Sequence, residues 1–514
     1  MPYLYRLVLS TLFFLNTAFF SLSAQDLEYL TPVITRHPNQ DSTVSLILTA
    51  DNQRRTHNKQ NKPYIQSVQI VDADQPWPPR WFSGTAPYTD DVFNKDTAQG
   101  YARFDFIEDV RIVAGHLSFF KLLGRPPMEQ SALDSPELDA YMLLNEKMEC
   151  IDTVSSLTAF RNLYFHDISI NEKGEKLVSL RKDTYLDLRD YTNNQADFSR
   201  HCEIDIIEEL DAKDSVLLSW NPLYHIDPNL FKFKEVLASH SFASNTDAIQ
   251  WTRLTSAQWD YDGNILYSMK HLGIGKISLA DGHIMWQINA VQMPIISGND
   301  TIQWYAQHDF NYRYQTDTTA IYTLYSDGLR DQGDDASPII IKPSCGVLFE
   351  INKKTSKVKV LHYQHPKERF VAVGQGGYDP EKNGDYLISY GFLRVPIEEN
   401  AEWANFLEYG KKDGTTTFYQ LPQGITCYKA HKLEGFKRPP RPVITKKGDE
   451  LQATGDMGDF TWYRLSGPNN TIVEKVGTGN AIRYGTGGIF CVAGKYGIGY
   501  AVSKPFSIFA NAPY

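Results

Sequence analysis

The stretch "DGNILYSM", residues 262–269, decides the fold class, because it joins a tight turn to an alternating strand. Two other stretches repeat its order of turn residue, Gly, polar residue and strand: "KGEKLVSL" at 173–180 and "NGDYLISY" at 383–390. Gly supplies the positive φ that a tight hairpin turn requires. The chain therefore carries one hairpin three times, which is a weak internal repeat.

A second hairpin of alternating apolar and polar residues accompanies these repeats. These second hairpins span residues 202–220, 275–288, 346–363 and 404–421. Two hairpins give four strands, which is the unit of a β-propeller blade. Four such blades are readable between about 160 and 425, and "AYMLLNEKMECIDTVSS" at 140–156 resembles the outer hairpin of another. The sequence therefore predicts an all-β protein built around a propeller over residues 101–436.

The two flanks of this region differ from it in composition. Residues 25–100 hold strand-like segments and the break "PWPPRW", so we expect a small N-terminal β-domain there. The proline-rich linker "FKRPPRPV" at 436–443 precedes short strands around Trp462 and Cys491. This pattern predicts an immunoglobulin-like β-sandwich over 437–514. A chain that ends near Phe436 is expected to stay soluble.

The N-terminus is typical of an export signal. Residues 1–24 contain one Arg, an apolar run and the small residues of "SLSA", so we expect a cleaved signal peptide. No later apolar stretch is long enough to span a bilayer, so stable membrane insertion is not expected. The predicted location is periplasmic, cell-surface or extracellular. The chain has five cysteines, so at least one is unpaired, and the connectivity of any disulfides stays open.

Composition and motifs exclude several classes of partner. The chain has 514 residues and a net charge of -10, without a long basic run, so a nucleic acid partner is not expected. It contains no CxxC or HExxH spacing that would predict zinc, and no GxGxxG or GxxxxGKS element. The segment "KKDGTTTF" at 411–418 is a hairpin turn rather than a phosphate loop. We therefore expect neither a metal nor a cofactor.

Polar residues at the heads of the inner strands are the candidates for chemistry, because these strands line a central channel. The candidates are His166, Arg253, Lys270 and His308. Histidine can act as a nucleophile or as a general acid and base. Arginine and lysine can hold a tetrahedral anion and offset the charge that develops on its oxygens. Together they predict an anion-binding cluster.

The order of several segments resembles the arylsulfotransferase family over roughly residues 130–425. The segments are "FHDISINEKGEKLVSL", "LSWNPLYHIDP", "LTSAQWDYDGNILYSMKH", "GHIMWQI" and "QHDF…YTLYSDG". The resemblance implies a six-bladed propeller that moves a sulfuryl group from an aryl sulfate to a phenolic acceptor without a nucleotide donor. It also implies that His308 is transiently sulfated.

The resemblance gives each candidate residue a role. His308 attacks sulfur, with Asp309 or a backbone carbonyl setting its tautomer, Arg253 and Lys270 neutralise the sulfuryl oxygens, and His166 accepts the proton of the acceptor phenol. Arg253 replaces the family's usual histidine and Lys270 its usual arginine, so whether the chain is an active enzyme stays open. The alternatives are a non-catalytic ligand-binding or adhesion propeller of the cell surface, and hydrolysis with water as acceptor.

Overall fold

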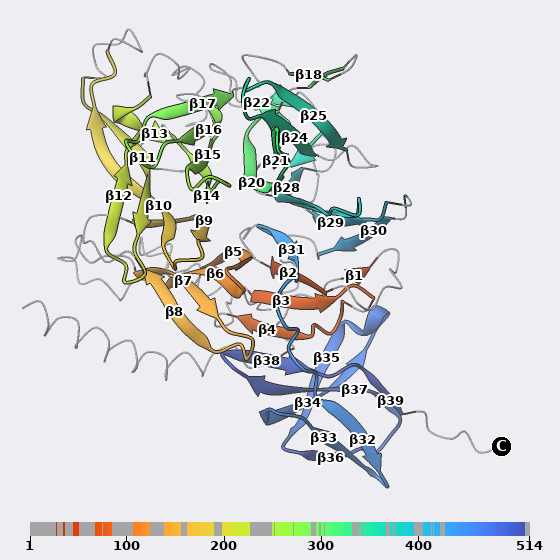
Figure 1. Cartoon of the computed structure of the whole chain (residues 1–514). Coiled ribbons are helices and arrows are strands. Elements are labelled where there is room, and N and C mark those ends of the chain that lie inside the picture. Colours follow the sequence, from red (N-terminus) through yellow and green to blue (C-terminus); the bar gives the residue numbers. More distant parts are fainter. Residues whose placement is uncertain are drawn as a thin grey trace, which may run out of the picture.

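The computed structural model (Figure 1) is all-β, which confirms the predicted fold class. Its described residues form strands and short 3-10 turns. No helix in this part of the chain is long and apolar enough to cross a membrane. The expected signal peptide, residues 1–24, lies outside the described residues. These residues are 27, 34–35, 45–50, 67–74, 76–84, 106–123, 138–155, 162–189, 198–226, 249–250, 252–270, 272–288, 295–297, 300–302, 304–330, 339–340, 343–365, 371–372, 374, 376–394, 404–412, 414, 416–421 and 427–508.

Four sheets follow one another along the chain, each with four antiparallel strands in sequence order, and the second sheet has β13 (Ile249–Gln250) as a parallel fifth strand. The first holds β5 (Phe106–Val113), β6 (His116–Leu123), β7 (Leu138–Leu144) and β8 (Cys150–Ser155). The second holds β9 (Asn162–Ile170), β10 (Lys176–Leu186), β11 (Arg200–Leu210) and β12 (Val216–Trp220). The third holds β14 (Leu254–Trp259), β15 (Ile265–Met269), β16 (Gly273–Ile277) and β17 (Ile284–Ile288). The fourth holds β20 (Gln307–Gln315), β21 (Thr319–Ser326), β24 (Cys345–Asn352) and β25 (Val358–Gln364).

Two further sheets join distant parts of the chain. One holds β27 (Gly376–Pro380), β28 (Tyr386–Arg394), β29 (Ala404–Gly410) and β30 (Thr416–Gln420), with β26 (Val371–Ala372) beside β28 and β1 (Ile34–Thr35) beside β30. The other begins with β31 (Ala430–Lys432), β2 (Ser45–Ala50), β3 (Ser67–Asp72) and β4 (Trp81–Gly84). Figure 1 shows β31, drawn in blue, beside the red β2. A late strand therefore completes a sheet of early strands.

The repeated hairpin phrase lies where the sequence predicts it. Its turn precedes β10, β15 and β28, each of which pairs with the strand before the turn. Gly174, Gly263 and Gly384 have φ of 77°, 79° and 94°, a backbone region that favours glycine. The second hairpins are also confirmed: they are β11–β12, β16–β17, β24–β25 and β29–β30, with β7–β8 for residues 140–156.

Six strands, which we call the inner strands, contact one another in a cycle. In order they are β5, β9, β14, β20, β27 and β31, and β31 contacts β5 again. Buried apolar residues fill the space between neighbouring sheets, as Tyr141 and Val178 do between the first two sheets and Leu266 and Phe349 between the third and fourth. Because this burial is shared, each sheet is stabilised by both of its neighbours.

Strand pairing crosses both domain boundaries that the sequence suggested, at residues 100 and 436. The sheet of β31, β2, β3 and β4 continues through β38 (Gly499–Val502), because β38 pairs with β4. Beyond it lie β37 (Gly488–Tyr496), β34 (Gly458–Ser466), β35 (Ile472–Thr478) and β39 (Phe506–Ile508). The early strands therefore share one sheet with late ones instead of forming a sheet of their own.

The C-terminal part has a core around Trp462, as expected. A separate three-stranded sheet of β32 (Val443–Lys447), β33 (Glu450–Thr454) and β36 (Ala481–Arg483) packs there. Trp462 is fully buried and contributes to the apolar cluster of this region. The proline-rich linker is fixed in place, because Arg441 donates to Asp72 at 2.9 Å and Arg80 donates to the same carboxylate at 2.8 Å. Cys150 and the buried Cys491 are free thiols.

Candidate functional site

His308 is the second residue of β20, and it is only 5% exposed. Its Nε2 lies 3.2 Å from Oδ2 of Asp327, a fully buried residue that directly follows β21. Strand pairing sets this contact, because His308 is opposite Tyr325, two residues before Asp327. The geometry forms a buried imidazole–carboxylate pair, which we call the His308–Asp327 pair.

Asp309 does not orient His308, contrary to the role considered from the sequence. A bulge between His308 and Asn311 gives Asp309 a φ of 52°. Its Oδ2 accepts the Tyr378 N–H at 3.1 Å, and its Oδ1 lies 3.5 Å from Nζ of Lys429. Adjacent residues of a strand direct their side chains to opposite sides, so neighbours in sequence rarely act as a pair. Asp327 lies in the segment "YTLYSDG", and no sequence motif of its own marks it as a partner of His308.

Arg253 and Lys270 lie close to the same carboxylate. The Lys270 N–H donates to the Arg253 carbonyl oxygen at 3.0 Å, so the two residues are joined through the backbone. Burial raises the pKa of Asp327, whereas the charges of His308, Lys270 and Arg253 act to lower it. Of the four predicted residues, His308 contacts this buried carboxylate directly, and Arg253 and Lys270 act on it through their charges.

For His166, only the backbone position is described. It lies on β9 immediately before Asp167, and its side chain is outside the part of the chain that the structure describes. Asp167 Oδ2 accepts the Ala257 N–H of the next inner strand at 3.2 Å. The same kind of contact joins Ser256 Oγ to the Phe310 N–H at 3.2 Å. These hydrogen bonds fix the register between neighbouring inner strands.

A buried charged layer lies beside the site and is formed by Asp109, Arg111, Asp167, Asp309 and Lys429. Lys429 Nζ lies 3.0 Å from Asp109 Oδ1, and Arg111 pairs with both Asp109 and Asp167. Burial raises the pKa of Asp167 to about 7, although Arg111 and Lys429 act against it. Burial also acts to raise the pKa of Asp309, but Lys429 and His431 lower it to about 2. Three carboxylates thus surround two cations, and Lys429 connects β31 to the other inner strands.

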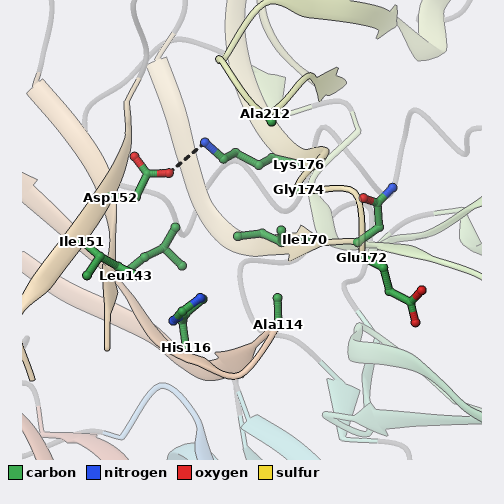
Figure 2. A pocket seen from close by; sticks show the side chains of 11 residues that line it. Ala114, His116, Leu143, Ile151, Asp152, Ile170, Glu172, Gly174, Lys176 and Ala212 are labelled. Carbon is green, nitrogen blue, oxygen red and sulfur yellow. Dashed lines mark hydrogen bonds and ion pairs between the residues drawn. The ribbon is translucent and has the colours of Figure 1, made fainter. Parts of the chain in front are cut away.

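A cavity of about 590 Å³ lies between the first two sheets, away from these residues (Figure 2). Its lining includes Ala114 and Gly174, which lie in the β5–β6 and β9–β10 turns. Lys176 reaches its wall but is paired with Asp152 at 2.9 Å and Asp214 at 2.7 Å. None of the predicted site residues lines this cavity. Among the described residues, no cluster of three His, Cys, Asp or Glu side chains is arranged to hold a metal.

Comparisons with known proteins give a family but no close relative. No curated protein matches the chain. Solved structures with similarity include a polysaccharide lyase, an ulvan lyase bound to -[GlcA(1-4)Rha3S]-, at 8% identity and a TM-score of 0.29, covering 79% of this chain and 96% of that one. A Bombyx mori β-fructofuranosidase has 10% identity and a TM-score of 0.30, covering 82% of this chain and 92% of that one. These TM-scores are too low to define the fold.

The match to one family model covers enough of the chain to assign its family. A model described as "Arylsulfotransferase (ASST)" matches residues 142–402, which is half of the 514-residue chain. The match includes His166, Arg253, Lys270 and His308, and also Asp327. It begins in β7 and extends beyond the end of β28. The chain therefore belongs to the arylsulfotransferase (ASST) family.

Proposed function

We propose that this chain transfers a sulfuryl group from an aryl sulfate to a phenolic acceptor, with His308 as the group that carries it. The observation that supports this most directly is the His308–Asp327 pair, buried beside Arg253 and Lys270. A histidine held by a carboxylate can act as a nucleophile, because the carboxylate fixes its tautomer and stabilises the imidazolium that forms. Family membership implies the same class of substrates.

The first step forms a nitrogen–sulfur bond and breaks the sulfur–oxygen bond of the donor. In the tautomer whose Nε2–H donates a hydrogen bond to Asp327, the lone pair of the imidazole is on Nδ1. Nδ1 attacks sulfur, and the aryloxide departs with the bonding electron pair. The sulfated ring is then a cation whose Nε2–H still faces the Asp327 carboxylate. In the second step a phenol oxygen attacks sulfur and the nitrogen–sulfur bond breaks, with its electron pair returning to Nδ1, so that His308 is regenerated. The phenol proton passes to His166, which releases it to the aryloxide.

Arg253 and Lys270 bind the sulfuryl anion and do not take part in proton transfer. Arginine stays protonated near neutral pH, so Arg253 binds and orients but does not act as a base. A sulfuryl group carries one negative charge in the ester and in the sulfated histidine. Arg253 and Lys270 carry two positive charges and Asp327 carries one negative charge. With a neutral His308, one positive charge therefore remains to balance the sulfuryl group. Such fixed charges stabilise the charge that develops on the leaving oxygen.

The architecture we propose for this activity is a six-bladed propeller followed by an immunoglobulin-like sandwich. The cycle of contacts through β5, β9, β14, β20, β27 and β31 supports the propeller. In this arrangement β31 supplies the innermost strand of the blade that also holds β2, β3 and β4. The two sheets around Trp462 support the sandwich. We further propose that residues 1–24 direct export, which would place the enzyme outside the cytoplasm.

The test is sulfuryl transfer from 4-nitrophenyl sulfate, followed with and without added phenol. We expect His308→Gln to abolish transfer and to lose the sulfuryl adduct that mass spectrometry detects in the wild type on residues 301–330. His283→Gln is the matched control, because His283 also pairs with an aspartate, Asp281 at 2.6 Å, but is exposed. Full transfer by His308→Gln would refute the assignment. Release of nitrophenol without transfer would indicate hydrolysis, and binding of an aryl sulfonate without turnover would indicate a binding protein.

A further inference from the structure

Arg253 has an unusual backbone for an arginine. Its φ is 42°, in the left-handed region that non-glycine residues rarely occupy. Such a conformation persists only where neighbouring contacts hold it, and it is found preferentially at functional positions. Both residues that flank Arg253 are fully buried, whereas Arg253 is partly exposed. The segment around Arg253 is therefore held in place, whereas its own side chain is partly accessible.

The contacts that hold this segment come mainly from one residue of another sheet, Asp205 on β11. The Leu254 N–H donates to Asp205 Oδ2 at 2.6 Å, and the Asp205 N–H donates to Thr252 Oγ1 at 2.8 Å. Asp205 therefore binds the residue before Arg253 and the residue after it. The Lys270 N–H fixes the carbonyl of Arg253 itself.

Asp205 is in turn fixed by Arg181, whose Nε donates to its Oδ1 at 3.1 Å. Asp205 is 1% exposed, so the hydrogen bonds that its carboxylate accepts from Arg181 and Leu254 do not compete with bulk water. The strand β13 (Ile249–Gln250), just before Thr252, also pairs in parallel with β11. The second sheet therefore presents a prepared surface to which residues 249–250 and 252–254 attach.

We propose that Asp205 is a positioning residue that fixes the left-handed backbone of Arg253 and so directs its guanidinium toward the His308–Asp327 pair. This inference rests on the proposed function in one respect, that Arg253 binds the sulfuryl anion. The sequence around Asp205 reads "CEIDIIEEL", an ordinary strand, so only the spatial arrangement gives it this role.

The conservative variant Asp205→Asn tests the proposal with little change in volume. An asparagine has one acceptor oxygen where the aspartate has two, and the charged Arg181 is the stronger donor. The amide NH₂ would then face the Leu254 N–H, so two donors would oppose each other and release the segment. Glu203→Gln is the matched control, because Glu203 also pairs with Arg181, at 3.1 Å, whereas the hydrogen bonds to Thr252 and Leu254 come from Asp205.

The experiment combines crystal structures of the wild type and both variants with calorimetry of an aryl sulfonate. We expect Asp205→Asn to shift Arg253 out of the left-handed region and to weaken binding about tenfold, as the loss of one charge-assisted hydrogen bond does. Glu203→Gln should keep both the conformation and the affinity. The double variant Asp205→Asn with Arg253→Met should bind no more weakly than Arg253→Met alone, because Asp205 acts through Arg253.

Additive losses in the double variant would overturn the proposal, and so would an unchanged Arg253 backbone in Asp205→Asn. A wild type that neither binds the sulfonate nor transfers sulfuryl groups would instead overturn the proposed function. In that case the crystal structures alone still decide whether Asp205 fixes the conformation of Arg253. The two failures are therefore distinguishable.

Discussion

Replacing Asp327 with asparagine should lower activity and raise stability at the same time. The variant Asp327→Asn keeps the shape of the side chain but removes the charge that faces Nε2 of His308. An asparagine can still accept a hydrogen bond from Nε2, but it can also offer its NH₂ and favour the wrong tautomer. It cannot balance the imidazolium that forms when His308 is sulfated.

The expected loss of activity follows from the contact that is removed. A hydrogen bond that involves a charged group contributes about 1.5–3 kcal/mol. Each 1.36 kcal/mol changes a rate about tenfold, so kcat should fall by a factor of about 10 to 150. The 3.2 Å separation is long for a charge-assisted hydrogen bond, which favours the lower part of this range.

The expected gain in stability follows from the pKa of Asp327. Burial raises this pKa above its value in the unfolded chain, so the folded chain binds more protons in the window between the two values. Stability therefore decreases as the pH rises through that window, and at pH 7 an ionised Asp327 costs folding free energy. Asparagine removes this cost, so the Tm of Asp327→Asn at pH 7 should exceed that of the wild type.

The assay measures initial rates of nitrophenol release with saturating phenol, and thermal unfolding at pH 7. Asp281→Asn is the control for the rate, since Asp281 contacts an exposed histidine and its loss should leave kcat unchanged. A variant at Asp327 with wild-type kcat would refute the role of the His308–Asp327 pair. A lower kcat with a lower Tm would show that the carboxylate is structural.

Two further predictions concern the framework around the site. Lys429→Met should lower the free energy of unfolding by about 3–5 kcal/mol, because it leaves buried Asp109 and Asp309 without their shared cation. Because Lys429 helps to lower the pKa of Asp309 to about 2, ionised Asp309 stabilises the fold at pH values above the pKa of an aspartate in the unfolded chain, and this stabilisation is lost as the pH falls toward 2. The variant should therefore unfold at a higher pH in an acid titration, and an unchanged midpoint would contradict this. A chain that ends at Phe436 should aggregate, contrary to the expectation from sequence, because β4 would lose its partner β38. Size-exclusion chromatography decides this, and a soluble monomer would contradict it.

The amino-acid sequence by itself determined the local elements of this protein. Turn glycines such as Gly263 and the alternation that follows them specify hairpins, because both signals act within a few residues. The sequence likewise indicated His308, Arg253 and Lys270, since each stands beside a recognisable turn or strand. Only the tertiary structure decided how distant strands combine. The pairing of β31 with β2 joins residues separated by most of the chain, and no local pattern encodes such a partner.

The same distinction explains the site. Sequence reasoning placed a carboxylate beside His308 at Asp309, its neighbour in the chain, but the pleat and the bulge of β20 turn that side chain toward Lys429. The actual partner, Asp327, comes from the end of the adjacent strand, and Asp205 reaches Arg253 from a different sheet. Such contacts depend on strand register and on the packing of sheets against one another, which are properties of the whole fold. Residue types capable of the chemistry were therefore visible in the sequence, whereas their pairing was decided by the tertiary structure.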